Sequence, residues 1–462
     1  MGALAKIYDV EETPPIGVTV VLSVQQVAVM AGSTVAAAAL TGLDPSVALF
    51  CSGLATLAFH ALTKGRVPAY LGSSFAFIAA IAAASRTYGA GSAAAGVSAA
   101  GAVYLVVGAL MVAVDRMGLA AMLRRRHVGH RRLRRRVHGL AWLKGVLPPW
   151  VAGPLVIVLS LALAPVAIGE AQSGWESAFV AAAIVVGVSV FARGLARLSA
   201  VLFGIVGGTA VAALSGDVDF RAVATASWVA VPKFTLALGH LPTMNLAAIG
   251  LVAPIALAAM AGDIAALLAI GGAVERNVVR RPGLHRALFA SGIATMLSGF
   301  VGGLPQTIYP ENIGLLALTR VWSARVLQGA AMIAMAFSFC GKLTAALAAI
   351  PAAVIAGVSI ALYGMVATVG VRMLVRSGVD FAHSGDMLIA AVILVVGMGG
   401  VVVRLGGVSF AGIAPAAVAG IALNLALPAG KDTGAAPKRK GDTKSERGKA
   451  VGPELVSEGG GI

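Results

Sequence analysis

The sequence predicts an all-α polytopic membrane protein, with about fourteen transmembrane segments in two related halves. Hydrophobic residues make up 59% of the 462 positions and charged residues only 12%. The mean hydropathy is +0.92, which is far outside the range of soluble domains. Apolar runs of about 20 residues recur along the chain, and each is long enough to cross a bilayer as a helix. Finally, two short stretches in opposite halves are interrupted by Gly and Pro, which is typical of a transporter's binding site.

The individual segments follow from hydropathy. They are predicted near residues 15–40, 44–63, 68–84, 91–114, 146–168, 176–195, 198–215, 243–270, 286–303, 306–318, 325–348, 351–371, 386–403 and 407–428. The first run lacks a basic leader and an A-x-A cleavage site, so we expect a retained helix instead of a signal peptide. Cys51 and Cys340 are the only cysteines. They lack the spacing of metal ligands, and we expect both to be buried as small apolar residues.

Positive charge follows the even-numbered segments and is scarce after the odd-numbered ones. The basic connections contain Lys64 and Arg66, the cluster 116–144, Arg193 and Arg197, the stretch 276–286, Arg320, and Arg372 with Arg376. By the positive-inside rule both termini are then cytoplasmic, in a multi-pass protein of the cell membrane. We expect the polar, charged tail after segment fourteen to be disordered.

Arginine is densest between segments four and five. The residues are Arg124, Arg125, Arg126, Arg131, Arg132, Arg134, Arg135 and Arg136. We expect this loop to attract anionic lipid headgroups, and nucleic acid is not needed to explain it. The nearby histidines have no Cys or carboxylate companions, so the loop does not indicate a metal site.

The stretch 302–314 places a carboxylate, Glu311, inside an apolar region. Charge at such a depth is costly and indicates function. The glycines and prolines before it exclude a continuous helix and predict an extended piece followed by a new helix at Pro310, with the positive end of the helix dipole at Glu311. In the first half, Ser74 follows Pro68 at the spacing at which Glu311 follows Pro305. Coincidence is the alternative in a chain so rich in Ala and Gly.

Three further polar residues lie within predicted segments. Gln25 and Gln26 are amides that a lipid-facing helix would lack, and they either bind a small planar ligand or bond a neighbouring helix. Asp263 either takes part in binding or is a structural carboxylate bonded to a nearby hydroxyl or to backbone left open at Gly262. We expect His60, beside Lys64 at the end of segment two, to be solvated.

The run from Glu311 to Arg320 resembles the signature of the nucleobase-cation symporter (nucleobase-ascorbate transporter) family, an acid or Gln followed by N-x-G-x-x-x-x-T-R. The stretches 68–77, 282–286 and 341–343 resemble bacterial uracil permeases, and the likeness covers roughly residues 15–428. It implies two inverted repeats of seven segments, a short strand at the start of segments three and ten, and a homodimer. It also implies import of uracil, xanthine or a related base, without a cofactor, by symport with a proton or with sodium.

The resemblance further implies a division into domains. These are the cytoplasmic N-terminus 1–14, a core domain of 15–115 and 243–348, the basic loop 116–145, a gate domain of 146–215 and 351–428, and the cytoplasmic tail 429–462.

Residue by residue, Glu311 would bond the base and the N–H of Phe75, next to Ser74, would donate to a base carbonyl, while Asn312 and Thr319 would shape segment ten. Several positions depart from the family pattern. The family's glutamate of segment eight falls on Gly262, about 100° around the helix from Asp263. Its Gln-His pair in segment one is Gln25-Gln26, a histidine of some uracil permeases falls on Ala266, and a Gly before the acid is Pro310.

The mechanism that we infer from the sequence is that Glu311, together with Asp263, binds ring N–H groups and couples protonation to transport. Burial of a carboxylate in low dielectric favours its protonated form. Three alternatives stay open: an anion carrier of the same fold, against which Glu311 counts because it would repel the cargo; an uncoupled pore; and an intramembrane enzyme. For an enzyme we find neither H-E-x-x-H nor G-x-S-x-G.

Overall fold

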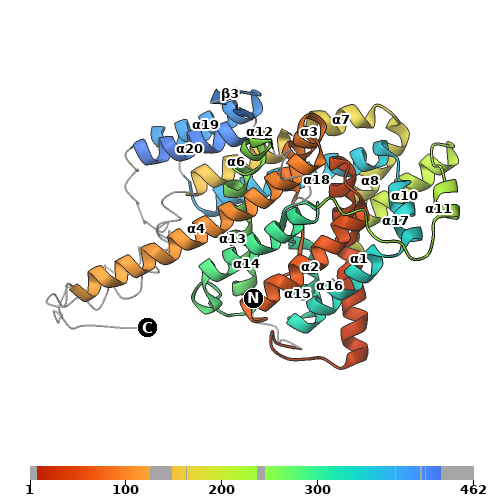
Figure 1. The fold of residues 1–462 in the computed structure, drawn as a ribbon, viewed down its shortest axis with the longest axis horizontal. Helices are drawn as coiled ribbons and strands as arrows, with labels where there is room; N and C mark the ends of the chain where they lie inside the picture. Colours follow the sequence, from red (N-terminus) through yellow and green to blue (C-terminus); the bar gives the residue numbers. More distant parts are fainter. Residues whose placement is uncertain are drawn as a thin grey trace, which may run out of the picture. The chain divides into compact units, whose positions relative to one another are not determined.

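A computed structural model describes residues 8–124, 148–162, 164–236, 245–379, 381–405, 408–411 and 413–427 (Figure 1). The predicted lipid-binding arginines after Arg124 lie outside the described residues, as do the predicted tail 429–462 and the first seven residues of the predicted N-terminus 1–14.

Helices dominate both halves of the chain. The first half contains α1 (Ile16–Thr41), α2 (Pro45–Thr63), β1 (Leu71–Ser73), η1 (Phe75–Phe77), α3 (Ile78–Tyr88), α4 (Ala90–Arg124), α6 (Pro149–Leu161), α7 (Ala164–Ala171), α8 (Trp175–Phe191), α9 (Leu195–Leu198), α10 (Ala200–Leu214) and α11 (Arg221–Thr225). The second half contains α12 (Leu246–Val252), α13 (Ile255–Ala273), η4 (Val279–Gly283), α14 (Leu284–Phe300), β2 (Gln306–Ile308), α15 (Pro310–Thr319), α16 (Ala324–Ser338), α17 (Gly341–Ala348), α18 (Ala352–Arg376), α19 (Ser384–Met398), β3 (Val402–Leu405), β4 (Val408–Ala411) and α20 (Ile413–Ala426).

Five helical stretches of the described chain are long and apolar enough to cross a membrane. They are Ile16–Thr41, Pro45–Thr63, Ala90–Val114, Leu246–Ala273 and Ala352–Val375. Shorter apolar helices include Trp175–Phe191, Ala200–Leu214 and Ala324–Ser338. The prediction of a mainly helical protein with several membrane-spanning helices is therefore confirmed.

Three predicted segments are not single helices. The segment near 146–168 is divided into α6 and α7, and the segment near 325–348 breaks between Ser338 and Gly341. The segment near 243–270 is divided into α12 and α13 at Pro254, which has no N–H to continue the helical hydrogen bonds. A second hairpin, β3 and β4, precedes α20 where we expected only helix. Hydropathy reports an apolar run but not a local break within it.

Helices of the two halves pack against one another. Helix α4 lies along α14, and α2 lies between α14 and α16, while α1 also contacts α16. Another set consists of α18 with α6 and α8, α19 with α6 and α20, and α10 with α8. The two sets meet where α1 contacts α10 and α18, and where α13 contacts α6 and α20.

Strands β1 and β2 form a two-stranded antiparallel sheet among these helices. Its register pairs Leu71 with Ile308 and Ser73 with Gln306. Gly302, whose φ is +86°, turns the chain into β2 as few other residues could. A side chain at Gly72 would collide with the ring of Tyr309. The backbones of the two halves therefore meet closely here.

The chain before α1 lies against the start of α16. Tyr8 pairs with Val321 in a parallel bridge. Tyr8 O accepts from the N–H of Trp322 at 3.0 Å, and Val10 O accepts from the N–H of Ala324 at 3.0 Å. We call residues 8–12 the N-terminal strap. Arg276 at the end of α13 bonds two strap carboxylates, Asp9 at 2.9 Å and Glu11 at 3.3 Å.

Two sequence expectations about single residues were wrong. His60 is 2% exposed, not solvated, because its ring bonds Ala69 O at 2.8 Å at the entry to β1. Cys51 is buried as expected, but Cys340 is only half-buried because it lies at the break between α16 and α17.

Candidate functional site

The carboxylate of Glu311 lies in the first turn of α15, which begins at Pro310 as predicted. Proline is suited to this position because the first helical N–H has no partner within the helix. Oε1 accepts from the hydroxyl of Ser33 on α1 at 3.0 Å. Oε2 is buried and accepts no hydrogen bond from any residue that the structure describes. One oxygen of the side chain is thus fixed, and the other is available.

Next to Glu311, Asn312 ties α15 to α1. Its Nδ2 donates to Gln26 Oε1 at 2.6 Å and to Gln26 O at 3.1 Å, and Asn312 is completely buried. Asn312 Oδ1 is a second buried atom without a partner within the described chain. Gln25 is half-buried on the same turn of α1. Gln26 therefore bonds a neighbouring helix, which was one of the two alternatives for it.

Tyr309 joins α15 to the first half from the other side. Its hydroxyl donates to Ser73 O at 3.0 Å and lies 3.3 Å from Thr34 Oγ1. Its N–H donates to Tyr70 O at 2.9 Å. Since Ser73 ends β1, this side chain fixes the distance between the two interrupted segments.

Helix η1 begins directly after β1. The N–H of Ser74 donates to Pro305 O at 2.9 Å and so continues the sheet. The next N–H, that of Phe75, is in the first turn of η1, where helix geometry offers no internal acceptor. Phe75 is half-exposed. Its N–H is a donor of the kind that anionic or carbonyl groups bind at helix N-termini.

Asp263 lies on α13 and contacts the far side of β2. Its Oδ1 accepts from the N–H of Ile308 at 3.0 Å, and its Oδ2 accepts from the hydroxyl of Tyr104 on α4 at 3.0 Å. Gly262 beside it is exposed, and a Cβ there would meet nothing within 4 Å. Of the two alternatives for Asp263, the structure contains the bond to a hydroxyl.

Two of the predicted residues connect the start of α15 to α1, and a third predicted residue of α15 does not. Glu311 bonds Ser33 and Asn312 bonds Gln26, whereas Thr319 bonds Leu315 O within its own helix at 2.9 Å. It lies about 12 Å along α15 from Glu311, at 1.5 Å per residue. The sequence reasoning did not single out Ser33, Thr34, Tyr104 and Tyr309. Hydroxyls are common in membrane helices and leave hydropathy almost unchanged, so no pattern distinguished them.

A metal centre was not predicted. Among the described residues there is no group of three or more His, Cys, Asp or Glu side chains placed to hold a metal ion.

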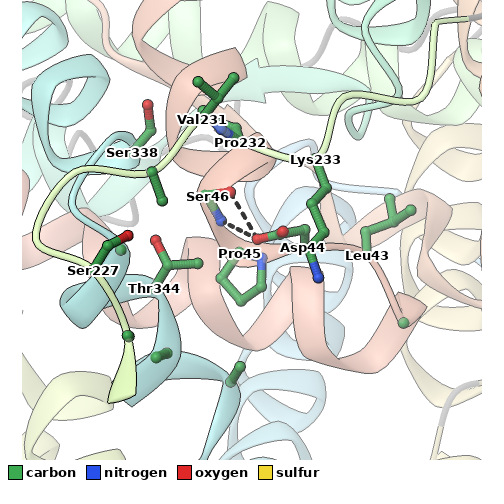
Figure 2. A pocket seen from close by; sticks show the side chains of 16 residues that line it. Leu43, Asp44, Pro45, Ser46, Ser227, Val231, Pro232, Lys233, Ser338 and Thr344 are labelled. Carbon is green, nitrogen blue, oxygen red and sulfur yellow. Dashed lines mark hydrogen bonds between the residues drawn. The ribbon is translucent and has the colours of Figure 1, made fainter. Parts of the chain in front are cut away.

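A hollow of about 550 Å³ lies elsewhere, near the turn between α1 and α2. Figure 2 shows it with Asp44, Lys233 and Thr344 among its lining side chains. Asp44 is occupied as the N-cap of α2, since it accepts from the N–H and hydroxyl of Ser46. Neither Glu311 nor the other predicted site residues line this hollow, so we do not assign the transport site to it.

Two solved structures have a similar fold. A structure described as the overall structure of SLC26A9 has a TM-score of 0.57 at 10% identity, covering 88% of this chain and 64% of that one. The transmembrane domain of a cyanobacterial bicarbonate transporter, BicA, has a TM-score of 0.52 at 16% identity, covering 87% and 96%. At these identities the likeness concerns the fold alone.

Sequence relatives extend over nearly the whole chain. It is 42% identical to a uracil permease of Bacillus caldolyticus over 91% of this chain and 95% of that protein. It is 38% identical to a uracil permease of Bacillus subtilis, over 89% and 92%. It is 36% identical to a putative pyrimidine permease, RutG, of Escherichia coli, over 90% and 91%.

The sequence profile described as the Permease family matches residues 17–126 and 135–406. Together with the apolar helices, these matches describe a multi-pass membrane protein. The named relatives are permeases, so the prediction of a transporter instead of an enzyme is confirmed. The chain belongs to the nucleobase-cation symporter (nucleobase-ascorbate transporter) family of permeases.

Proposed function

We propose that this protein imports a nucleobase, such as uracil, xanthine or a related purine or pyrimidine, by proton symport with alternating access. The observation that carries the proposal is the buried Oε2 of Glu311, which has no donor among the described residues. An unpaired carboxylate oxygen in low dielectric is costly unless a ligand or a proton occupies it. The names of the relatives, uracil and pyrimidine permeases, support the choice of cargo.

A flat neutral base suits the groups around this oxygen. Its ring N–H would donate to Glu311 Oε2, and a ring carbonyl would accept from the N–H of Phe75 at the start of η1. Ser74 directly precedes Phe75, and Gln25 directly precedes Gln26, the partner of Asn312. Ser33 and Asn312 hold Glu311 and its helix in place. Glu311 is our candidate for the proton-coupling group, because its second oxygen is free to take up a proton.

The moving parts in this proposal are a core domain of residues 15–115 and 243–348 and a gate domain of residues 146–215 and 351–428. The packing of α4 with α14 and of α2 with α16 supports a core built from both halves, and the packing of α18 with α6 and α8 supports a separate gate. Rocking of the gate against the core would open the site to each side in turn. Cytoplasmic termini and a homodimer belong to the same proposal.

Purified protein tests the cargo directly. We expect saturable binding of at least one base from a panel of uracil, xanthine, hypoxanthine, adenine and urate. In proteoliposomes we expect concentrative uptake that a protonophore abolishes. We expect Glu311→Gln to lose the response to the proton gradient, because an amide cannot carry the proton. If this variant still takes up base in a manner that collapses with the protonophore, Glu311 is not the coupling group.

An anion carrier is the alternative, because the similar solved structures include a bicarbonate transporter. Glu311 argues against it, since a carboxylate at the N-terminus of α15 would cancel the attraction of the helix dipole for an anion. Uptake of bicarbonate or sulfate, with no binding of any base in the panel, would favour the alternative.

A further inference from the structure

The sheet of β1 and β2 has two free edges, and side chains close them. In an antiparallel pair, alternate residues direct their N–H and C=O groups away from the partner strand. The bonds from Tyr309 N to Tyr70 O and from Ser74 N to Pro305 O fix which residues do so. Leu71, Ser73, Gln306 and Ile308 are accordingly the residues with outward-directed groups.

Each of these four residues has at least one outward-directed backbone group bonded to a side chain. The hydroxyl of Thr56 on α2 accepts from Leu71 N at 2.9 Å and donates to Leu71 O at 3.2 Å. On β2, the hydroxyl of Thr295 on α14 accepts from Gln306 N at 3.1 Å and donates to Gln306 O at 3.2 Å. Each threonine thus replaces a missing neighbouring strand. A buried backbone group without such a partner is costly where there is no water.

Asp263 accepts a hydrogen bond from the outward N–H of Ile308, as Thr295 accepts one from Gln306. Its Oδ1 receives the outward N–H of Ile308, the last residue of β2. Its Oδ2 receives the hydroxyl of Tyr104, so the carboxylate also links the strand to α4. Both oxygens face donors, and the side chain is 2% exposed. A proton on Oδ1 would meet the N–H of Ile308, and a proton on Oδ2 would require the hydroxyl of Tyr104 to turn from donor to acceptor.

Asp263 therefore differs from Glu311, one of whose oxygens is free. The residue of α13 next to Asp263 that is exposed is Gly262, and it has no side chain that could bind a ligand. We propose that Asp263 is a positioning residue, a fixed anion that holds the end of β2 and thereby sets the place of Glu311, and that it binds neither the base nor the transported proton. The effect of Asp263 on base binding rests on the proposed function, whereas its role in holding β2 does not.

Four variants of the full-length protein test this proposal. Asp263→Ala removes the acceptor. Asp263→Asn keeps an oxygen for Ile308 N–H, and its amide can donate to Tyr104, whose hydroxyl also accepts. Thr295→Val is the matched control, because it opens the same edge of β2 without touching any charge. Glu311→Gln changes the proposed coupling group itself.

The first measurement is hydrogen–deuterium exchange by mass spectrometry, which needs no substrate. We expect faster exchange across residues 306–312 in Asp263→Ala and in Thr295→Val, and near-parental exchange in Asp263→Asn. Parental exchange in Asp263→Ala would overturn the positioning role. If the parent protein binds none of the bases in the panel, the proposed function fails, while this measurement still decides the role of Asp263.

The second measurement is the Kd for uracil, or for whichever base of the panel binds, as a function of pH. We expect Asp263→Ala and Thr295→Val each to weaken binding at least tenfold, Asp263→Asn to restore most of this loss, and all three to keep the pH profile of the parent. Only Glu311→Gln should flatten that profile. A flattened profile in Asp263→Asn would show that Asp263 exchanges the proton, and would overturn the proposal.

Discussion

Removal of the hydroxyl of Tyr309 is the perturbation that tests the site geometry most directly. This hydroxyl is the link between the end of β1, at Ser73 O, and the start of α15, and it also touches Thr34. Tyr309→Phe keeps the ring above Gly72 but leaves the carbonyl of Ser73 buried without its donor. An unsatisfied buried acceptor costs about 1–3 kcal/mol.

At about 1.4 kcal/mol per tenfold change, this loss corresponds to a roughly 5- to 150-fold effect if all of it opposes base binding. The part that does not appear in the Kd should appear as a lower melting temperature of the purified protein. We would measure both, by equilibrium binding and by thermal unfolding in detergent.

Tyr70→Phe is the matched control. Tyr70, just before β1, is also buried, and among the described residues its hydroxyl lies 3.3 Å from Ser52 Oγ of α2. We expect Tyr70→Phe to lower the melting temperature slightly and to leave the Kd within about twofold, because Ser52 keeps its bond to Leu49 O. Parental affinity and stability in Tyr309→Phe, or equal loss of affinity in the two variants, would refute the reasoning.

Three other predictions concern the glycines Gly72 and Gly262, the amide of Asn312 and the guanidinium of Arg276. Gly72→Ala should abolish uptake at normal expression, because its methyl group collides with the ring of Tyr309. Gly262→Ala should keep the melting temperature of the parent, because a Cβ there meets nothing within 4 Å. Uptake normalised to the amount of protein on an immunoblot tests the first variant, and thermal unfolding tests the second. Asn312→Ala removes the two bonds from Asn312 to Gln26 of α1 and should lower stability by about 1–3 kcal/mol. The expected result is a fall in melting temperature, and a parental value would contradict it. Arg276→Ala breaks two partly exposed ion pairs and should change the free energy of unfolding by less than about 1 kcal/mol. A large drop in melting temperature would contradict this expectation and would mean that these ion pairs hold the N-terminal strap in place.

Composition and the positions of Gly and Pro predicted the local backbone structure around Glu311. The break before α15 and its start at Pro310 follow from backbone chemistry that one residue type imposes locally. The prediction of a carboxylate in an apolar region needed only hydropathy. These signals are local, so a single sequence contains them.

The partners of Glu311 could not be predicted in the same way. Ser33 is 278 residues away along the chain, and nothing in a helix rich in Ala, Ser and Thr distinguishes the one hydroxyl that faces the carboxylate. His60 was misjudged for a related reason. Its position near Lys64 indicated an interface with solvent, but the chain that leads into β1 provides Ala69 O as its partner. Long-range pairing of this kind is decided by tertiary contacts that no local pattern reports.

The N-terminal strap has a consequence for the order in which the molecule is made. The backbone that Tyr8 pairs with, at Val321, is synthesised about 300 residues after Tyr8. At roughly 5–20 residues per second, this amounts to a delay of about 15–60 seconds. Throughout that interval the strap lacks the backbone at 321–324 that it bonds in the folded protein. A nascent chain arrested before Trp322 should therefore expose the strap to added protease, and one arrested well beyond Ala324 should protect it.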